Sequence, residues 1–311
     1  MLNLKEHKDQ RIFEKLLEKS DILIENFSYG VLKKLGYSWT YLKKKYPKII
    51  YAKISGFGET GPYKNLPAYD IIVQAMGGIM SITGNDKEKY ARVGSSVGDI
   101  VAGLYTVIGV VSALRARSKT AKGMKIDISM LDCQVAILEN AISRYSIQKK
   151  NPFPLGTHHP NISPFGAFET NDRAIVIAAG NQKLFEKFCL AIGKKDLILN
   201  KKFINNEKRN QNFKFLKNEI ESILIKKKSK FWIQKLNKFK IPCSTIDTIK
   251  DVIKNPQILS RNMILDYYDK DIGRINVSGN PIKFNDLKEN TTSELAPELD
   301  ADRKKILKNL T

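Results

Sequence analysis

The chain has 311 residues, with 53 Lys and Arg against 32 Asp and Glu, and a formal net charge of +21. This length suits two domains, or one large domain with a smaller one inserted, and the 42% of hydrophobic residues excludes a chain too polar to form a core. The lysines are spread along the whole sequence at solvent-facing helix positions, so solvated helix faces explain them better than a nucleic-acid surface does. An anionic small ligand such as a nucleotide phosphate would also be attracted by this charge.

The cysteines and the apolar segments indicate the compartment. Cys133, Cys189 and Cys243 lie far apart in apolar contexts and form no CxxC pair, which indicates buried thiols in a reducing environment. The longest apolar run, residues 100–114, is shorter than the roughly 20 residues of a membrane span and predicts a buried helix. The first residues are charged and lack the apolar core of a signal peptide. We therefore expect a cytoplasmic protein that does not enter the membrane.

Residues 1–150 alternate helices with short apolar strands. Strands are expected over residues 21–26 and 49–54, and helices over residues 7–19, 31–35, 41–45 and 69–76. This alternation is typical of an α/β fold whose parallel sheet is covered on both faces. The three glycines of the loop at residues 56–63 permit either a close backbone approach to a ligand or an ordinary tight turn. Asp99 is expected to cap the apolar helix that follows it.

The spacing of the apolar residues changes within the stretch from Gly123 to Ile142. Residues 125–130 alternate between apolar and polar side chains, as a strand does, and residues 131–141 then place their apolar side chains on one helical face. Asp132 is therefore expected in the first turn of a helix, where unpaired amides and the helix dipole favour negative charge. The residues alone leave two interpretations open: Asp132 caps its helix, or it is a reactive carboxylate at the mouth of a cleft.

The composition changes after Asn140. Residues 151–165 predict a linker, residues 166–245 a small α+β domain, and residues 246–311 a second linker with a C-terminal return to the large domain. The elements expected here are a hairpin that turns at residues 171–172, helices over residues 182–192, 212–226, 228–238, 245–253 and 300–310, and strands over residues 263–268 and 272–277. His158 and His159 are adjacent and have no carboxylate cluster nearby, so no metal site is expected.

Ten short motifs together resemble the class III CoA-transferases, the family of formyl-CoA transferase, carnitine CoA-transferase and α-methylacyl-CoA racemase. They are DILIENF (21–27), LG (35–36), IIYAKISGFGETGPY (49–63), AYD (68–70), GG (77–78), GD (98–99), GMKIDISMLD (123–132), HP (159–160), PFGAFET (164–170) and IPC (241–243). The resemblance implies a Rossmann-like large domain with a parallel sheet, a smaller α+β domain, and an interlocked homodimer.

The resemblance also implies a chemistry and a set of site residues. Asp132 matches the family's nucleophile, which attacks an acyl-CoA thioester and carries the acyl and CoA groups in turn as an anhydride and a thioester. The positions that match CoA contacts are Asn26, Phe27, Lys34, Leu35, Tyr69 and Gly180. Tyr69 stands where racemases have a catalytic His, and a phenol is a poor base at neutral pH. This implies CoA transfer between an acyl-CoA and a carboxylic acid, with a racemase-like isomerase as the alternative.

The chain departs from the family pattern at three places. Lys34 stands where the family usually has an Arg, which keeps the charge and loses the bidentate fork. Ser28 replaces an Arg, which implies one phosphate contact fewer. The family's first several dozen residues, with the first strand, its glycine turn and further CoA contacts, have no counterpart in this sequence. A third alternative is therefore a truncated, inactive family member.

Overall fold

The computed structural model describes residues 1–87, 89–269, 271–289 and 296–310. It divides into two compact units, the first made of Met1–Gly156 with Leu299–Thr311 and the second of Thr157–Glu298. The division into domains and linkers that we predict at residues 150, 165 and 245 stays a prediction.

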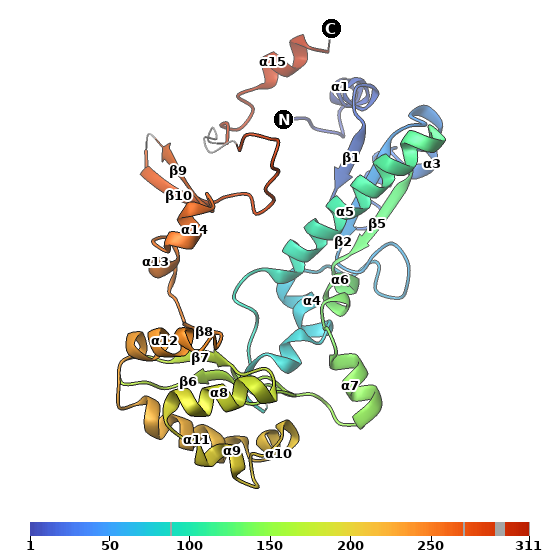
Figure 1. Cartoon of the computed structure of the whole chain (residues 1–311). Coiled ribbons are helices and arrows are strands. Elements are labelled where there is room, and N and C mark those ends of the chain that lie inside the picture. Colours follow the sequence, from blue (N-terminus) through green and yellow to red (C-terminus); the bar gives the residue numbers. More distant parts are fainter. Residues whose placement is uncertain (88, 270, 290–295, 311) are drawn as a thin grey trace. The chain divides into compact units, whose positions relative to one another are not determined.

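The first unit is built on a parallel sheet of three strands in the order β1-β2-β5 (Figure 1). These strands are β1 (Ile22–Glu25), β2 (Ile50–Ser55) and β5 (Lys125–Ser129). Ile22 pairs with Ile50, and Tyr51 pairs with Lys125, so the three strands end at the same edge. The predicted α/β class with a parallel sheet is confirmed. Short apolar strands that alternate with helices form such a sheet because each crossover returns the chain in the same direction.

One face of this sheet is covered by the long helix α5 (Val97–Thr120), which contacts β2 and β5 (Figure 1). Ile50 and Ala52 of the sheet pack against Val110 and Ala113 of the helix. By length and composition α5 is also a candidate membrane span, and 28% of its most apolar window is buried. The prediction of a buried helix is therefore wrong for the face of α5 turned away from the sheet, which is exposed.

The opposite face of the sheet is partly covered by shorter helices, and Leu17, Leu42, Tyr46 and Tyr51 lie in one cluster there. These helices are α1 (His7–Glu18), α2 (Val31–Lys34) and α3 (Trp39–Lys45). The other elements of the unit are α4 (Asp70–Met76), η1 (Ile79–Ile82), β3 (Gly84–Asp86), β4 (Lys89–Tyr90), α6 (Met130–Ala136), α7 (Ala141–Gln148) and α15 (Arg303–Lys308).

The helix expected over residues 131–141 is broken: α6 ends at Ala136, and Glu139 adopts a left-handed conformation with φ of 53° before α7 begins.

The second unit is an α+β arrangement around an antiparallel sheet in the order β6-β7-β8. Its core includes Phe168, Ile177, Phe185, Leu216 and Trp232, all fully or almost fully buried. The elements are β6 (Phe165–Phe168), β7 (Ile175–Ala178), α8 (Gln182–Ile192), α9 (Asp196–Leu199), α10 (Asn206–Gln211), α11 (Phe213–Leu224), α12 (Ser229–Lys238), β8 (Cys243–Thr245), α13 (Ile249–Val252), α14 (Pro256–Ser260), β9 (Ile264–Asp269) and β10 (Gly273–Ser278).

Three local predictions in this unit have different outcomes. The hairpin expected around residues 171–172 is present as the pair β6-β7, and the strands expected over residues 263–268 and 272–277 are present as the pair β9-β10. The helix expected over residues 245–253 is wrong at its start, because Cys243–Thr245 pairs with β7 and the helix begins at Ile249. Thr248 caps it and forms a reciprocal capping box with Asp251.

Candidate active site

Asp132 lies in the first turn of α6, directly after β5 ends. The switch from strand to helix occurs at Ser129, whose side-chain oxygen accepts a hydrogen bond of 3.1 Å from the Asp132 backbone N–H. Ser129, which is buried, is therefore the N-cap of α6, because its side chain accepts a backbone N–H of the first turn. The interpretation of Asp132 as the helix cap is wrong, because another side chain fills that role.

The Asp132 carboxylate is available for chemistry. Its residue is exposed, and among the described residues no hydrogen bond or ion pair reaches its side chain. The backbone amides beside it are already used: the Leu131 N–H donates to the carbonyl of Gly56 at 3.0 Å, and the Asp132 N–H donates to Ser129. The first turn of α6 therefore presents a carboxylate held by a fixed backbone and places no unpaired amide from Leu131 or Asp132 beside it.

The glycine-rich loop at residues 56–63 is attached to the same end of the sheet. Besides the Gly56 carbonyl, the Glu59 N–H donates to the Asp127 carboxylate at 2.9 Å. Gly58 has a φ of 78°, and a Cβ there would lie 3.4 Å from that of Ser129. The positive φ of Gly58 and the contacts of the loop with β5 and α6 give this segment a structural role, and a close approach of its backbone to a ligand stays a prediction.

A helix junction behind Asp132 fixes α6 in place. The Asp70 carboxylate of α4 accepts hydrogen bonds from the Gly98 N–H at 2.8 Å and from the Gln74 amide at 2.7 Å. Asp70 therefore caps α5, and the prediction that Asp99 caps it is wrong: Asp99 lies inside the first turn, where burial and the charge of Asp70 raise its pKa. The same junction holds Gln134, two residues after Asp132, which is fully buried.

The predicted CoA contacts of the large domain lie together around the carboxyl end of β1. Asn26 and Phe27 are exposed in the loop that follows the strand, and the Phe27 N–H donates to the Glu25 carboxylate at 2.6 Å. Lys34 is exposed at the end of α2, and Leu35 follows it, half-buried against the cluster around Leu42. Their roles in binding stay predictions.

The two remaining predicted contacts belong to different units. Tyr69 is 80% exposed at the start of α4, a helix that packs against α6. Gly180 lies in the second unit, in the exposed loop after β7, and a Cβ there would have open space around it. Asn181 follows it and caps α8 by accepting a hydrogen bond from the Leu184 N–H.

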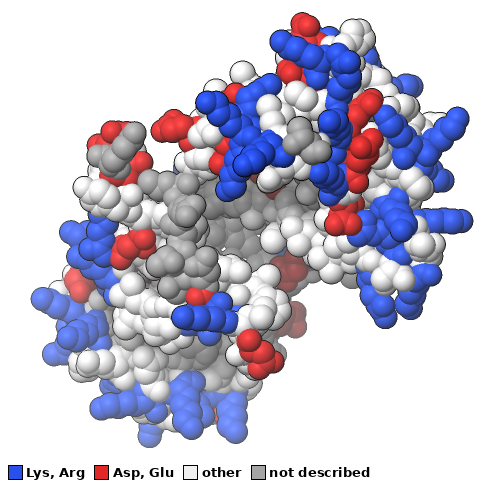
Figure 2. All heavy atoms as spheres, turned by 90° about the horizontal axis from the view of Figure 1, so that it is seen from above, with Lys and Arg blue, Asp and Glu red and all other residues white. Residues whose placement is uncertain are grey.

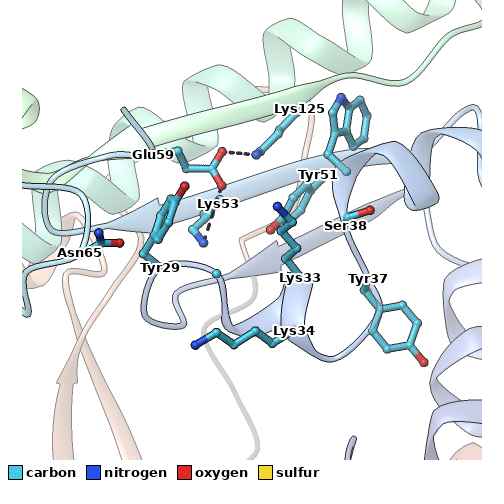
Figure 3. A pocket seen from close by; sticks show the side chains of 12 residues that line it. Tyr29, Lys33, Lys34, Tyr37, Ser38, Tyr51, Lys53, Glu59, Asn65 and Lys125 are labelled. Carbon is cyan, nitrogen blue, oxygen red and sulfur yellow. Dashed lines mark ion pairs between the residues drawn. The ribbon is translucent and has the colours of Figure 1, made fainter. Parts of the chain in front are cut away.

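A cavity of about 500 Å³ opens on the sheet face opposite α5 (Figure 3). It takes in Lys34 from the predicted contacts, together with residues that the sequence did not single out. The lining residues are Tyr29, Gly30, Lys33, Lys34, Tyr37, Ser38, Trp39, Tyr51, Lys53, Glu59, Asn65 and Lys125. For Tyr51 and Lys53, the signal was the alternation in the strand at residues 49–54, which places both side chains on one face of the sheet. From the sequence, this strand is interpreted as an apolar run.

An ion-pair network forms the floor of this cavity. Lys53 is 2% exposed and lies 3.2 Å from Glu25 and 3.8 Å from Glu59, whose carboxylate also pairs with Lys125 (Figure 3). The Tyr51 hydroxyl donates to Glu25 at 2.8 Å, and burial, followed by this hydrogen bond, raises the pKa of Tyr51. Buried charges are stable only when they are paired in this way.

The other candidates for chemistry have structural contacts. Burial, followed by the charge of Asp132, raises the pKa of the Cys133 thiol, which disfavours a thiolate. His158 stacks on Phe213 with ring centroids 3.5 Å apart, and His159 accepts a hydrogen bond from the Asn161 N–H. In the part of the chain that the structure describes, no group of three or more His, Cys, Asp or Glu side chains could hold a metal ion.

The positive charge is distributed over the surface. Figure 2 shows Lys and Arg side chains over much of the visible face, with Asp and Glu between them. Part of this charge is paired locally, as between Lys45 and Glu14 at 2.7 Å and between Arg117 and Asp21 at 2.7 Å. This distribution agrees with solvated helix faces on the side that is visible.

Comparison with known proteins adds to this geometry. The sequence pattern of CoA-transferase family III matches residues 1–303. The acetyl-CoA:oxalate CoA-transferase of Acetobacter aceti is 38% identical over 96% of this chain and 76% of its own length. The succinyl-CoA:glutarate CoA-transferase of Mus musculus is 32% identical over 92% of this chain and 66% of its own. The chain thus spans about two thirds to three quarters of the length of these relatives.

A solved structure agrees with the fold. A CaiB/BaiF family protein from Brucella suis superposes with a TM-score of 0.86 and 32% sequence identity, over 100% of this chain and 80% of its own. The family pattern covers nearly the whole chain, and the fold of the present chain agrees over its whole length with 80% of the Brucella suis protein. This chain therefore belongs to CoA-transferase family III.

Proposed function

We propose that the protein transfers CoA from an acyl-CoA thioester to a free carboxylic acid, with Asp132 as the nucleophile. The observation that carries this proposal is the exposed Asp132 carboxylate, which no hydrogen bond or ion pair from the described residues reaches, on a backbone held by Ser129 and Gly56. The named relatives, which are CoA-transferases, support it.

The reaction proceeds through four exchanges at Asp132. Its carboxylate attacks the thioester carbonyl, the C–S bond breaks, and CoA thiolate leaves behind a mixed anhydride. The thiolate then attacks the aspartyl carbonyl, which releases the first carboxylate and forms an aspartyl-CoA thioester. The acceptor carboxylate attacks this thioester and again expels the thiolate. The thiolate finally attacks the acyl carbonyl of the second anhydride, which yields the new acyl-CoA and regenerates Asp132.

The backbone positions the Asp132 carboxylate, and burial keeps the nearest other nucleophile, the Cys133 thiol, from attacking the acyl group. A carboxylate on a rigid strand-to-helix junction keeps its orientation through both covalent stages, which lowers the entropic cost of each attack. The neighbouring Cys133 thiol is 6% exposed and has a raised pKa, so it does not compete for the acyl group.

The central test is the variant Asp132→Ala, compared with Asp132→Asn, which has nearly the same shape. Both should lose thioester exchange by several orders of magnitude, because no other carboxylate lies in the first turn of α6. Mass spectrometry after incubation with an acyl-CoA should find CoA attached to the peptide that contains residue 132. Full exchange by Asp132→Ala, or a stable adduct on another residue, would refute this mechanism.

We further propose that the acceptor is a dicarboxylate. Oxalate and glutarate appear in the names of the relatives, and the net charge of +21 attracts dianions. A panel of oxalate, succinate and glutarate against acetate and propionate measures this preference as kcat/KM. A higher value for the monocarboxylates would contradict it.

Isomerisation of a 2-methylacyl-CoA is the competing activity, and Tyr69 argues against it. Its side chain is 80% exposed at the position where racemases of the family carry a His, and an exposed phenol is a weak base at neutral pH. Incubation of a 2-methylacyl-CoA in deuterated water should leave the α-carbon without deuterium. Incorporation at a rate that matches thioester exchange would favour the isomerase.

We propose a homodimer on the basis of the uncovered face of α5. Leu104, Val107, Ile108 and Val111 on this helix are each more than half exposed, and exposed apolar side chains that gather on one helix mark an interaction surface. Light scattering of the purified chain should give twice the mass of one chain. The variant Val107→Lys should shift the protein toward the monomer, and a monomeric unsubstituted chain would contradict the proposal.

A further inference from the structure

Glu59 attaches the glycine-rich loop at residues 56–63 to the sheet through both its backbone and its side chain. Its N–H donates to the Asp127 carboxylate at 2.9 Å. Its carboxylate lies 3.8 Å from the Lys53 ammonium and also pairs with Lys125 (Figure 3). Lys53 belongs to β2, whereas Lys125 and Asp127 belong to β5. One residue of the loop therefore contacts two neighbouring strands.

The three partners of Glu59 lie on one face of the sheet. Lys53 is the register partner of Asp127, and Lys125 precedes Asp127 by two residues, so the three side chains point to the same side. Lys53 is buried, and the Glu25 carboxylate of β1 lies 3.2 Å from its ammonium. A buried charge that loses its last partner is strongly destabilising, but Lys53 keeps Glu25 when the Glu59 carboxylate is removed. Glu59 can therefore be substituted in a folded protein.

The same loop holds the helix turn that carries Asp132. Its first residue, Gly56, accepts a hydrogen bond of 3.0 Å from the Leu131 N–H, one residue before Asp132. Glu59 follows Gly56 by three residues, so these two attachments are at most about 11 Å apart along the chain. A loop released at Glu59 is free to shift at Gly56, and the Leu131 N–H then loses the acceptor that fixes the first turn of α6.

We propose that Glu59 is a positioning residue for the nucleophile Asp132. Its ion pairs with Lys53 and Lys125 hold the glycine-rich loop in place, and the loop presents the Gly56 carbonyl to the turn that carries Asp132. This inference rests on the proposed function for the role of Asp132. Because Glu59 acts through the loop backbone, its loss slows the attack by Asp132 without weakening the binding of the acyl-CoA.

The test replaces Glu59 by Gln, which keeps the size of the side chain and removes its charge. The matched control is Glu14→Gln, because Glu14 also pairs with a lysine, Lys45, at 2.7 Å, but lies on α1. Amide hydrogen exchange measured by mass spectrometry gives a readout that needs no turnover. Glu59→Gln should speed exchange in the peptides that contain residues 56–63 and 129–136 about three- to tenfold, as expected for a locally weakened attachment. Glu14→Gln should leave both peptides unchanged.

The second readout is the rate at which an acyl-CoA forms the CoA adduct on residue 132. Rapid mixing with increasing concentrations of acetyl-CoA or succinyl-CoA gives a limiting rate constant and an apparent dissociation constant. Glu59→Gln should lower the limiting rate constant about 10- to 100-fold, since small displacements of a reacting group have effects of this size. The apparent dissociation constant should stay the same or fall. Glu59→Asp, which retains the charge, should recover most of the rate.

The two readouts together decide the inference. Unchanged exchange at residues 129–136, or an unchanged limiting rate constant, in Glu59→Gln would overturn it. A raised dissociation constant with an unchanged limiting rate constant would overturn it as well, because Glu59 would then be a binding residue. If the unsubstituted protein forms no adduct with either donor while Glu59→Gln still speeds exchange at residues 129–136, the proposed function is refuted and the attachment of this turn through Glu59 is upheld.

Discussion

The contact between Gly77 and α6 allows a sharp test of how the backbone positions Asp132. Gly77 ends α4 with an ordinary negative φ, so an alanine there meets no conformational penalty. A Cβ at this position would, however, lie 2.5 Å from the Cβ of Gln134 and 2.7 Å from the carbonyl oxygen of Val73. Because Gln134 is fully buried, the overlap with its Cβ requires α6 to move away from α4 by about 1 Å, the difference from an ordinary carbon contact, and the overlap with the Val73 carbonyl requires a shift at the end of α4 itself.

Gly77→Ala should therefore change stability and catalysis together. Overpacking of this kind costs about 1–3 kcal/mol of the free energy of unfolding, which urea denaturation measures as a lower midpoint. A shift of about 1 Å in a helix that carries the nucleophile should lower kcat about 100-fold. The matched control is Gly94→Ala, whose added Cβ has open space within 4 Å. A Gly77→Ala protein with the stability and exchange rate of the control would refute the packing argument.

Three further changes test other parts of the structure. Asp70→Ala removes the acceptor for the Gly98 N–H at the start of α5 and should lower the free energy of unfolding by about 2 kcal/mol in urea titrations. Lys45→Met should make the melting temperature fall less steeply as the pH is lowered into the acid range. The Lys45 hydrogen bond lowers the pKa of Glu14. The pair therefore stabilises the fold above the ordinary carboxyl pKa, and this stabilisation is lost as the pH falls through the lowered pKa. Arg209→Met should destabilise the second unit by about 3 kcal/mol, seen as an earlier urea transition, because its guanidinium satisfies buried carbonyl oxygens.

Each of these has an outcome that would contradict it. An unchanged urea midpoint for Asp70→Ala would mean that water replaces the carboxylate at the helix start. Equal acid dependence with and without Lys45 would assign the acid transition to other groups. The control for Arg209 is the preceding residue, Lys208, which is exposed and whose replacement by Met should leave the transition in place. Equal urea transitions for the two variants would show that the buried guanidinium does not stabilise the second unit.

The sequence predicted the elements whose evidence is local. The change of period after residue 129 placed Asp132 in the first turn of a helix, and the structure has the strand end at Ser129 and the helix begin at Met130. The break before α7 could not be predicted in the same way. Residues 137–140 contain neither Gly nor Pro, and Glu139 adopts its left-handed conformation in a chain that has to turn there.

A contact between distant residues explains one error at the site. A local interpretation gave the cap of α5 to Asp99, the acid nearest to the helix start, whereas the structure uses Asp70, which is 28 residues away from Gly98. The error at Asp132 has a local origin instead. Ser129 was interpreted as an ordinary strand residue, and its hydrogen bond from the Asp132 N–H, three residues on, shows that it caps α6, while no partner among the described residues reaches the Asp132 carboxylate.

The polar face of the sheet links these features. Lys53 looks out of place in a central strand, where a buried amine costs several kcal/mol unless carboxylates surround it. Glu25 comes from the neighbouring strand and Glu59 from the glycine-rich loop, so burial of Lys53 requires both that strand and that loop to be in place. The backbone of Glu59 in turn donates to Asp127 on β5. The charges that make the cavity attractive to an anion therefore also hold the loop against the strand that leads to the nucleophile, and a ligand that drew Lys53 or Lys125 away from Glu59 would loosen the loop beside Asp132.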